Sequence, residues 1–214
     1  MTMQLYTYFR SSAAYRVRIA LNLKGLQAEY IPVHLVNNGG EQHSEMFRRV
    51  NPGELVPALI EDDFTLTQSL SMIEYLEEKF PETPLLPKDL QQRALIRAFS
   101  LNIACDIHPL NNLRVLQYLS KTLNASDEQK TEWYRHWVVT GLKALEAQLT
   151  HSNGQFCFGD QPSLADCCLI PQVYNAKRFN IDLSDFPKIE SIYAHCNSLD
   201  AFQKAAPEAQ PDAA

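Results

Sequence analysis

The feature that most constrains the fold is a change of pattern at the proline-rich segment PETPLLP, residues 81–87. Before it, short apolar runs typical of strands alternate with patterns typical of amphipathic helices. After it, strand patterns nearly vanish and helical periodicity fills the chain. Three prolines within this segment exclude a helix interior, because proline lacks an N–H group and clashes with the preceding turn. We therefore predict an α/β first half, a linker and an all-helical second half.

The first half has the order β-α-β, then a loop region with room for a helix, then β-β-α. Strand patterns cover LYTYF and EYIPVHL, and the helix between them runs from Ser12 to Lys24 and stops at Gly25. This order predicts parallel pairing through a crossover helix. VPALIE and FTLT predict a hairpin with Asp62-Asp63 at its turn, followed by a helix over 69–80.

The second half shows helical patterns over about 91–122, 127–150, 163–178 and 188–204. Ser163 lies three residues before Asp166 and ahead of an apolar run, which is the spacing of a capping box and needs no catalytic role. The terminal PEAQPDAA is expected to fray. The predicted ranges are a first domain at 1–82, a linker at 83–89 and a helical domain at 90–214.

The composition of the chain argues against several classes of binding partner. The formal charge is −6 and the pI is near 5.5, which argues against nucleic acid as a partner. No run of 18 apolar residues and no signal-peptide pattern occur, so we expect neither a membrane span nor secretion. The five cysteines form no CxxC pair and no finger-like spacing, which predicts free thiols in the cytoplasm and no metal site.

Polar residues gather where helices begin. Arg10, Ser11 and Ser12 stand between the first strand and its helix, and Gln68-Ser69 heads the helix after the hairpin. Unpaired N–H groups and the helix dipole make such termini suited to anions. A cis bond at Val56-Pro57 would leave the backbone of Val56 free to pair with an extended ligand. A small peptide with carboxylates and a thiol fits these features, whereas the alternative for Ser11 or Ser12 is a plain N-cap.

The chain resembles the zeta class of glutathione transferases, which includes maleylacetoacetate isomerase, and is similarly close to bacterial maleylpyruvate isomerases. The resemblance spans nearly the whole chain and is carried by SSAAYRVRIALNLKG, NPGELVPALIEDDFTLTQSLSMIEYLEE, CDIHPLNNLRVLQYL, GDQPSLADCCLIPQV and FPKIE. It implies a thioredoxin-like N-terminal domain that binds glutathione, followed by an all-α C-terminal domain that shapes the second-substrate site. It also implies a homodimer.

The resemblance assigns the site residue by residue. Ser11 would face the glutathione sulfur, with Ser12 beside it and Arg10 acting with them in catalysis. Residues that would contact glutathione elsewhere are Gln42, the backbone of Val56, Gln68, Ser69, His108 and Asn112. Residues that would bind the carboxylates of a small dicarboxylate substrate are Arg10, Arg114 and Arg178.

Several of these residues have structural alternatives. Pro109 should bend the helical pattern in which it lies. His108 and Asn112, four residues apart, are expected to share one face with Asn111 at its edge, and His108 is either a hydrogen-bonded structural histidine or a general acid. Arg10 is alternatively a solvated charge, and Arg178 alternatively complements the end of its helix. Arg16 and Arg18 diverge by about 200° around a helix, which favours structural roles for both, although the class motif includes Arg16.

One departure affects the mechanism. The zeta motif reads SSCxxR, whereas Ala13 occupies the cysteine position here. A hydroxyl and a helix terminus must therefore suffice to lower a thiol pKa of about 8.5, by about one unit or 1.4 kcal/mol.

The implied reaction is the glutathione-dependent cis–trans isomerisation of maleylacetoacetate to fumarylacetoacetate in tyrosine and phenylalanine catabolism. The alternatives are a maleylpyruvate isomerase, a transferase or dehalogenase acting on small electrophilic acids, and a non-catalytic module.

Overall fold

The computed structural model describes residues 3–150 and 152–213. The chain divides into two compact units, one formed by Met1–Leu85 with Asn197–Ala214 and the other by Leu86–Cys196. Residues 197–214, which the predicted ranges place with the helical domain, group with the first unit in this division. The C-terminal segment therefore follows the helical unit in sequence but belongs to the first unit by its contacts.

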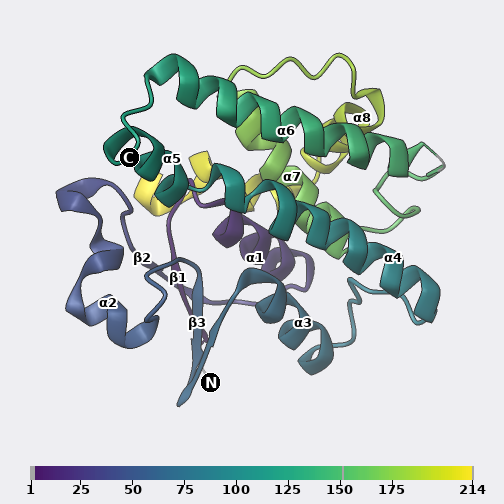
Figure 1. The fold of residues 1–214 in the computed structure, drawn as a ribbon. Coiled ribbons are helices and arrows are strands. Elements are labelled where there is room, and N and C mark those ends of the chain that lie inside the picture. Colours follow the sequence, from purple (N-terminus) through teal and green to yellow (C-terminus); the bar gives the residue numbers. More distant parts are fainter. Residues whose placement is uncertain (1–2, 151, 214) are drawn as a thin grey trace. The chain divides into compact units, whose positions relative to one another are not determined.

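The first unit contains a four-stranded mixed sheet in the order β2-β1-β3-β4, and Figure 1 shows β1 between β2 and β3. β1 pairs with β2 in parallel, whereas the β1–β3 and β3–β4 pairs are antiparallel. The α/β, thioredoxin-like prediction is confirmed. The elements are β1 Met3–Thr7, α1 Ser12–Leu23, β2 Glu29–Pro32, α2 Glu45–Val50, β3 Ala58–Glu61, β4 Phe64–Thr67 and α3 Ser69–Lys79, with 3₁₀ turns at Asn37–Gly39 and Glu41–His43.

Local chemistry sets the ends of these elements. Gly25 follows α1 with φ of 67°, a left-handed conformation that glycine adopts without steric cost. Asp62 takes φ of 52° in the turn that joins β3 to β4, where aspartate is tolerated. The parallel β1–β2 pair needs a crossover, and α1 provides it. The predicted helix stop and hairpin turn are thus confirmed.

The C-terminal segment packs on α1. α9, Asp200–Ala205, has Phe202 and Ala205 fully buried, and Asn22 of α1 donates to the carbonyl of Ala201 at 2.9 Å. Two 3₁₀ turns follow, at Pro207–Ala209 and Pro211–Ala213. The buried Gln210 amide donates to the carbonyls of Lys204 and Ala206 at 2.9 Å. The expectation of a frayed tail is wrong for 207–213, because each proline starts a 3₁₀ turn and Gln210 ties the segment to carbonyls at the end of α9.

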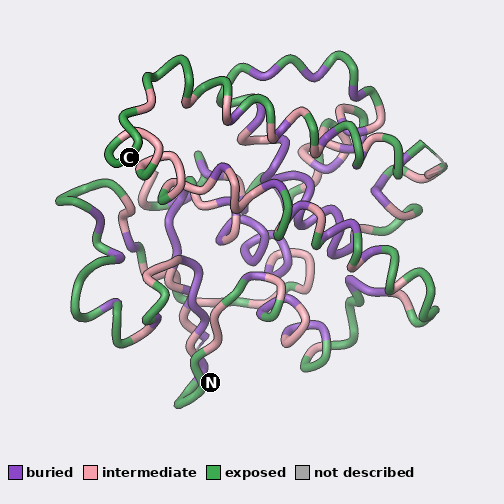
Figure 2. The backbone as a smooth tube through the Cα atoms, viewed as in Figure 1, coloured by how far each residue is buried: buried purple, intermediate pink, exposed green. Residues whose placement is uncertain are grey.

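The second unit is helical, as predicted. In its described residues the β structure is limited to one isolated bridge, Phe156 to Gly159. α7 is buried along most of its length, and Figure 2 shows the buried residues in purple. The helices are α4 Leu90–Leu101, α5 Leu113–Lys121, α6 Asp127–Leu149, α7 Leu164–Arg178 and α8 Pro187–Cys196, with a π-helix at Asn102–Ile107 and a 3₁₀ turn at Pro109–Asn111.

Two predicted helices are interrupted. The pattern over 91–122 holds α4, a π-helix, a 3₁₀ turn and α5, because Pro109 cannot donate to the helical ladder. The pattern over 188–204 separates into α8 and α9, and Leu199 between them has extended backbone.

Two further expectations concern the chain as a whole. Within 3–150 and 152–213, no helix has both the length and the apolar character that a bilayer crossing requires. All five cysteines are free, and Cys105 is the exposed one.

Candidate functional site

Ser11 caps α1. Its backbone is extended, and its Oγ accepts from the N–H of Ala14 at 3.2 Å. This bond uses a lone pair of the oxygen and leaves the O–H proton to donate outward. Ser12 is the first residue of the helix and is buried. The junction therefore offers a hydroxyl donor beside the positive end of a helix dipole, which suits an anion such as a thiolate.

An apolar cluster supports this junction. Tyr8, Phe9 and Val56 are buried in it together with Val33 and Phe47. Arg10 is exposed, and its guanidinium lies 4.8 Å from the centroid of the Phe9 ring. This stacking directs an exposed positive charge along the surface next to Ser11. A guanidinium in such a position suits the carboxylate of a small acid.

A second helix terminus carries Gln68 and Ser69. Gln68 stands at the N-cap of α3 with φ of 69° and ψ of 114°, an unfavourable conformation for a residue other than glycine. Its side chain is exposed and forms no cap bond, so it is available to a ligand. Ser69 is buried, and its Oγ accepts from Arg16 Nη1 of α1 at 3.3 Å. The backbone strain at Gln68 fits a binding role for this terminus.

Val56 presents its backbone as expected. The Val56–Pro57 bond is cis, and in the described part of the chain neither the N–H nor the C=O of Val56 pairs with another backbone group. Asn51 shapes the preceding loop: its Nδ2 donates to Leu55 O at 2.6 Å and its Oδ1 accepts from Gly53 N at 2.9 Å. The strand edge at Val56 is therefore open to an extended ligand.

Gln42 is 6% exposed and holds an unsatisfied acceptor. Its Nε2 lies 3.0 Å from His43 Nε2 and 3.5 Å from Leu35 O, whereas its Oε1 has no hydrogen-bond partner among the described residues. Gly40 beside this amide has φ of 105°, a backbone conformation that residues with a Cβ rarely adopt, so glycine is favoured there. Buried polar atoms without partners are rare in folded proteins. A ligand donor would satisfy Gln42 Oε1.

An ionic group stands next to Gln42. His43 Nδ1 is hydrogen-bonded to Glu54, and Arg48 Nε donates to the same carboxylate at 2.5 Å. These bonds, first from His43 and then from Arg48, hold the pKa of Glu54 below its usual value. A carboxylate on Nδ1 favours the ring tautomer whose Nε2 accepts from the Gln42 amide. The amide oxygen of Gln42 is then the atom left for a ligand.

In the first unit, the structure connects the predicted residues through α1 and the apolar cluster. Val56 packs in the cluster that contains Phe9, two residues before Ser11. Ser69 is hydrogen-bonded to α1 through Arg16, a contact that the sequence reasoning missed. Two signals pointed to Arg16, its angle of about 200° from Arg18 around the helix and its place in the class motif, but neither identified Ser69 as its partner.

In the second unit, the predicted shared face of His108 and Asn112 is wrong. His108 ends the π-helix, whereas Asn112 has extended backbone and caps α5, its Oδ1 accepting from Arg114 N at 3.1 Å. The Arg114 side chain is exposed. Arg178 is exposed in the last turn of α7, with its guanidinium 4.8 Å from the Phe179 ring centroid. The alternative prediction, a cation at a helix end, describes this position of Arg178.

Asn111 is a further polar residue of the second unit. It is 8% exposed, and among the described residues neither amide atom has a hydrogen-bond partner. The sequence placed it only at the edge of a helical face. No group of three His, Cys, Asp or Glu side chains in the described ranges is arranged to hold a metal ion.

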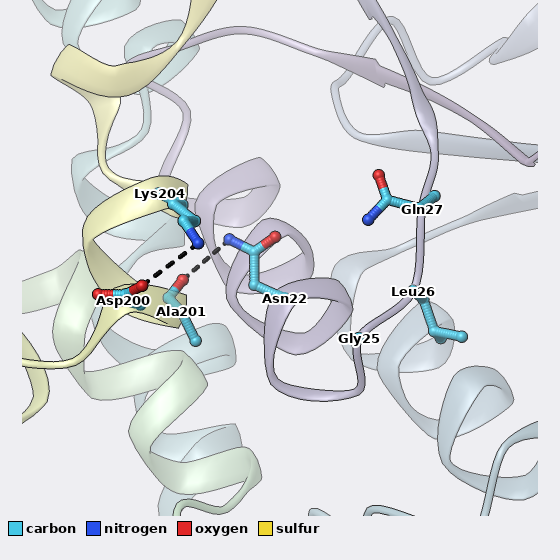
Figure 3. Close-up of a pocket in the computed structure, with 7 residues that line it drawn as sticks. All are labelled: Asn22, Gly25, Leu26, Gln27, Asp200, Ala201 and Lys204. Atoms are coloured by element: carbon cyan, nitrogen blue, oxygen red, sulfur yellow. Dashed lines mark hydrogen bonds and ion pairs between the residues drawn. The ribbon is translucent and has the colours of Figure 1, made fainter.

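A surface hollow of about 260 Å³ lies at the other end of α1 (Figure 3). Asn22 and Gly25 line one side, and Asp200 and Lys204 of α9 form an ion pair at 3.3 Å on the other. Since α1 has 12 residues, this hollow is about 18 Å from Ser11 along the helix axis. It is therefore separate from the candidate site.

Comparisons with known proteins place these features in a family. The protein-family model described as "Glutathione S-transferase, N-terminal domain" matches residues 5–84, and the family model described as "Glutathione S-transferase, C-terminal domain" matches residues 130–196. A probable maleylacetoacetate isomerase of Vibrio cholerae is 53% identical over 213 residues, covering 100% of this chain and 99% of that protein.

Two solved structures are similar over nearly their full length. The first is the holo structure of a maleylpyruvate isomerase, described as a bacterial zeta-class glutathione S-transferase. It has a TM-score of 0.95 and 46% identity, and the match covers 99% of this chain and 100% of that one. The second is a maleylacetoacetate isomerase of Methylobacterium extorquens AM1 with bound malonate and glutathione. It has a TM-score of 0.94 and 41% identity, with 99% of each chain covered.

Proposed function

Because the chain belongs to the zeta class of the glutathione transferase family, we propose that it catalyses the glutathione-dependent cis–trans isomerisation of maleylacetoacetate to fumarylacetoacetate. The observation that carries the proposal is 53% identity, over the whole chain, to a probable maleylacetoacetate isomerase. The related structure with bound malonate and glutathione supports both the cofactor and a small dicarboxylate as substrate. We place the reaction in the catabolism of tyrosine and phenylalanine.

The first unit fits glutathione. The unpartnered Oε1 of Gln42 offers an acceptor, and the open backbone of Val56 offers strand-like pairing to a peptide. Gln68 and Ser69 stand at a helix terminus suited to the γ-glutamyl carboxylate. When bound, glutathione would supply a thiolate that adds to the cis double bond, leaving a single bond that can rotate before elimination returns the thiolate and the trans acid.

The residues of α1 hold the negative charge of the sulfur. The O–H of Ser11 donates to it, and the helix dipole at Ser12 stabilises it. Together they lower the thiol pKa by about one unit, or about 1.4 kcal/mol. No cysteine is needed at position 13, where this chain has Ala13.

Arginines bind the substrate carboxylates in this proposal. Arg10 is exposed next to Ser11 and also stabilises negative charge that develops on the oxo acid. We propose Arg114 and Arg178 as further carboxylate ligands, and His108 and Asn112 as glutathione contacts. We also propose a cytoplasmic homodimer, with a sedimentation mass of twice the 24.4 kDa chain.

A second candidate is isomerisation of maleylpyruvate. It is favoured by the TM-score of 0.95 to a maleylpyruvate isomerase. Both substrates carry the cis double bond and the carboxylates that the site requires.

Product analysis tests the proposal. Purified protein is incubated with each maleyl substrate, with and without glutathione, and the cis and trans acids are quantified. We expect the fumaryl product to form only with glutathione and at a higher kcat/KM from maleylacetoacetate. Preference for maleylpyruvate would select the second candidate. Turnover of chlorinated acids with none of either maleyl acid would instead identify a transferase or dehalogenase.

Arg10→Ala provides a test of the carboxylate role. We expect KM for the maleyl acid to rise about tenfold with little change in Kd for glutathione, since one charged hydrogen bond is worth about 1.5 to 3 kcal/mol. Equal losses for both ligands would remove Arg10 from the substrate site.

A further inference from the structure

The backbone of Phe9, the residue before Arg10, is held by charged side chains at both of its polar groups. Its N–H donates to Asp212 Oδ2 at 2.9 Å, and its C=O accepts from Arg18 Nη2 at 3.0 Å. Asp212 lies more than 200 positions later in the sequence, in the last 3₁₀ turn. The junction between β1 and α1 is therefore fixed by the C-terminal segment.

Arg18 extends this connection. Its side chain is 0% exposed, and it donates to Thr7 Oγ1 at 3.0 Å, Tyr8 O at 3.4 Å and Ala205 O at 3.0 Å. The same Tyr8 carbonyl accepts from Ser11 N at 2.9 Å. Burial lowers the pKa of Arg18 to about 10, so the guanidinium remains charged at neutral pH. One buried cation thus joins the Tyr8–Ser11 turn to the segment after α9.

Asp212 is itself held in place. The Gln210 amide donates to Lys204 O and Ala206 O, which closes the turn before it. Ala213, the next residue, packs against the cluster that contains Phe9. Because the residues on both sides of Asp212 are held by contacts, its carboxylate is a fixed hydrogen-bond acceptor.

We propose that Asp212 and Arg18 are positioning residues for Ser11, and that the C-terminal segment is part of the machinery that activates glutathione. This inference rests on the proposed function. The two side chains set the direction of the Tyr8–Ser11 turn, and the turn sets where the Ser11 hydroxyl points. A shift of this hydroxyl lengthens its bond to the sulfur and raises the thiol pKa.

Loss of the Asp212 charge and displacement of Ser11 would shift the thiol pKa in opposite directions, so the two effects can be told apart. Removing the negative charge of Asp212 would by itself favour a nearby thiolate and lower the thiol pKa. Losing the bond to Phe9 N–H would misplace Ser11 and raise it. Asp212→Asn removes the charge but keeps an amide oxygen that can accept, whereas Asp212→Ala removes both.

The experiment uses the full chain with three variants: Asp212→Ala, Asp212→Asn and the control Asp200→Ala. Asp200 lies in the same segment and forms an exposed ion pair with Lys204. Hydrogen exchange of the Phe9 amide is followed by NMR without glutathione. The pKa of bound glutathione is then titrated by its ultraviolet thiolate absorbance, and kcat/KM is measured with maleylacetoacetate.

In Asp212→Ala we expect faster Phe9 exchange, a higher thiol pKa and about a tenfold loss in kcat/KM, because small misplacements of catalytic groups are costly. Asp212→Asn should stay within about twofold of the unaltered chain, since its amide restores the bond. Asp200→Ala should match the unaltered chain in all three measurements.

Other results overturn the inference. A thiol pKa in Asp212→Ala that is no higher than in Asp212→Asn, which lacks the same charge, would show that the segment does not position Ser11. Equal losses of kcat/KM in Asp212→Asn and Asp212→Ala would show that the hydrogen bond to the Phe9 N–H is not what positions Ser11. Failure of the proposed function is distinct, because the unaltered chain would then neither lower the thiol pKa nor isomerise the substrate, while the Phe9 exchange would still report on the contact.

Discussion

At the scale of single residues, Ser11 caps α1 and is the residue that we propose to face the glutathione sulfur. Its oxygen accepts from Ala14 N to cap α1, and its O–H proton is left to donate to a ligand. The cap is confirmed, and it does not exclude the proposed chemical role of Ser11. A hydroxyl with two lone pairs and one proton meets both needs in one position.

We predict that Ser11→Ala separates these two roles. Loss of the cap should cost about 1 kcal/mol of unfolding free energy. Loss of the donor should raise the pKa of bound glutathione by about one unit and lower kcat/KM at least tenfold. Urea unfolding, thiolate titration and steady-state kinetics measure the three effects.

Ser44→Ala is the matched control. Ser44 caps α2 by accepting from Phe47 N at 3.2 Å, the same length as the Ser11 bond. It should lose comparable stability and keep the thiol pKa. If both variants lost activity in proportion to stability, Ser11 would be a cap only.

The sequence predicted residues whose signal is local. Ser11 and Ser69 each follow a strand pattern with one residue between and stand at the start of a helical pattern, although only Ser11 acts as a cap. Arg18 and Asp212 have no such signal, because their partners are distant backbone groups. Gln42 Oε1 was expected to contact a ligand only by resemblance, and its lack of a partner emerges from packing alone.

At the scale of elements, the capping boxes of α6 and α7 differ in burial. In α7, Asp166 is fully buried, and its carboxylate accepts from Ser163 N and Cys157 N, both at 2.8 Å. In α6, Gln129 Oε1 accepts from Ser126 N at 2.9 Å at the exposed surface. The capping box should therefore contribute more to the free energy of unfolding in α7 than in α6.

We predict that Asp166→Ala costs about 3 kcal/mol of unfolding free energy, because two buried N–H groups lose their acceptor. Gln129→Ala should cost about 0.5 kcal/mol, since water replaces its bond. Denaturant unfolding with a common m-value gives both numbers. Similar losses for the two variants would mean that burial does not govern the strength of these caps.

Element boundaries show where periodicity is insufficient. α3, α6 and α7 begin and end within about two residues of prediction, because each has a clear cap or a proline beside it. The pattern over 91–122 continues through a π-helix and a 3₁₀ turn, since side-chain spacing barely changes there. Pro109 signalled a bend but not a new N-cap at Asn112.

At the scale of the whole molecule, the first unit is discontinuous in sequence. Its sheet and α1 come from the N-terminal part, whereas α9 and the turns after it come from the C-terminal end. α9 packs on α1 with Phe202 fully buried. The sequence could not show this, because a proline-containing tail of small residues resembles a frayed end.

A fragment ending at Leu85 is therefore predicted to be largely unfolded, although it contains every strand and the predicted domain 1–82. Arg18 would lose the acceptor Ala205 O, which costs about 2 kcal/mol for a charged group, and Phe9 N–H would lose Asp212. The apolar face of α1 would also lose α9. A small domain with a stability near 5 kcal/mol does not tolerate these losses together.

Joining residues 197–214 to this fragment through a Gly/Ser linker of about 20 residues should restore folding, because such a linker spans the gap as a flexible coil. Circular dichroism and amide dispersion in NMR compare the two proteins. The joined fragment with Asp212→Ala should still fold, since it loses one bond only, whereas omission of α9 should not be rescued. A stable fragment ending at Leu85 would show that the C-terminal segment is not required for the fold of the first unit.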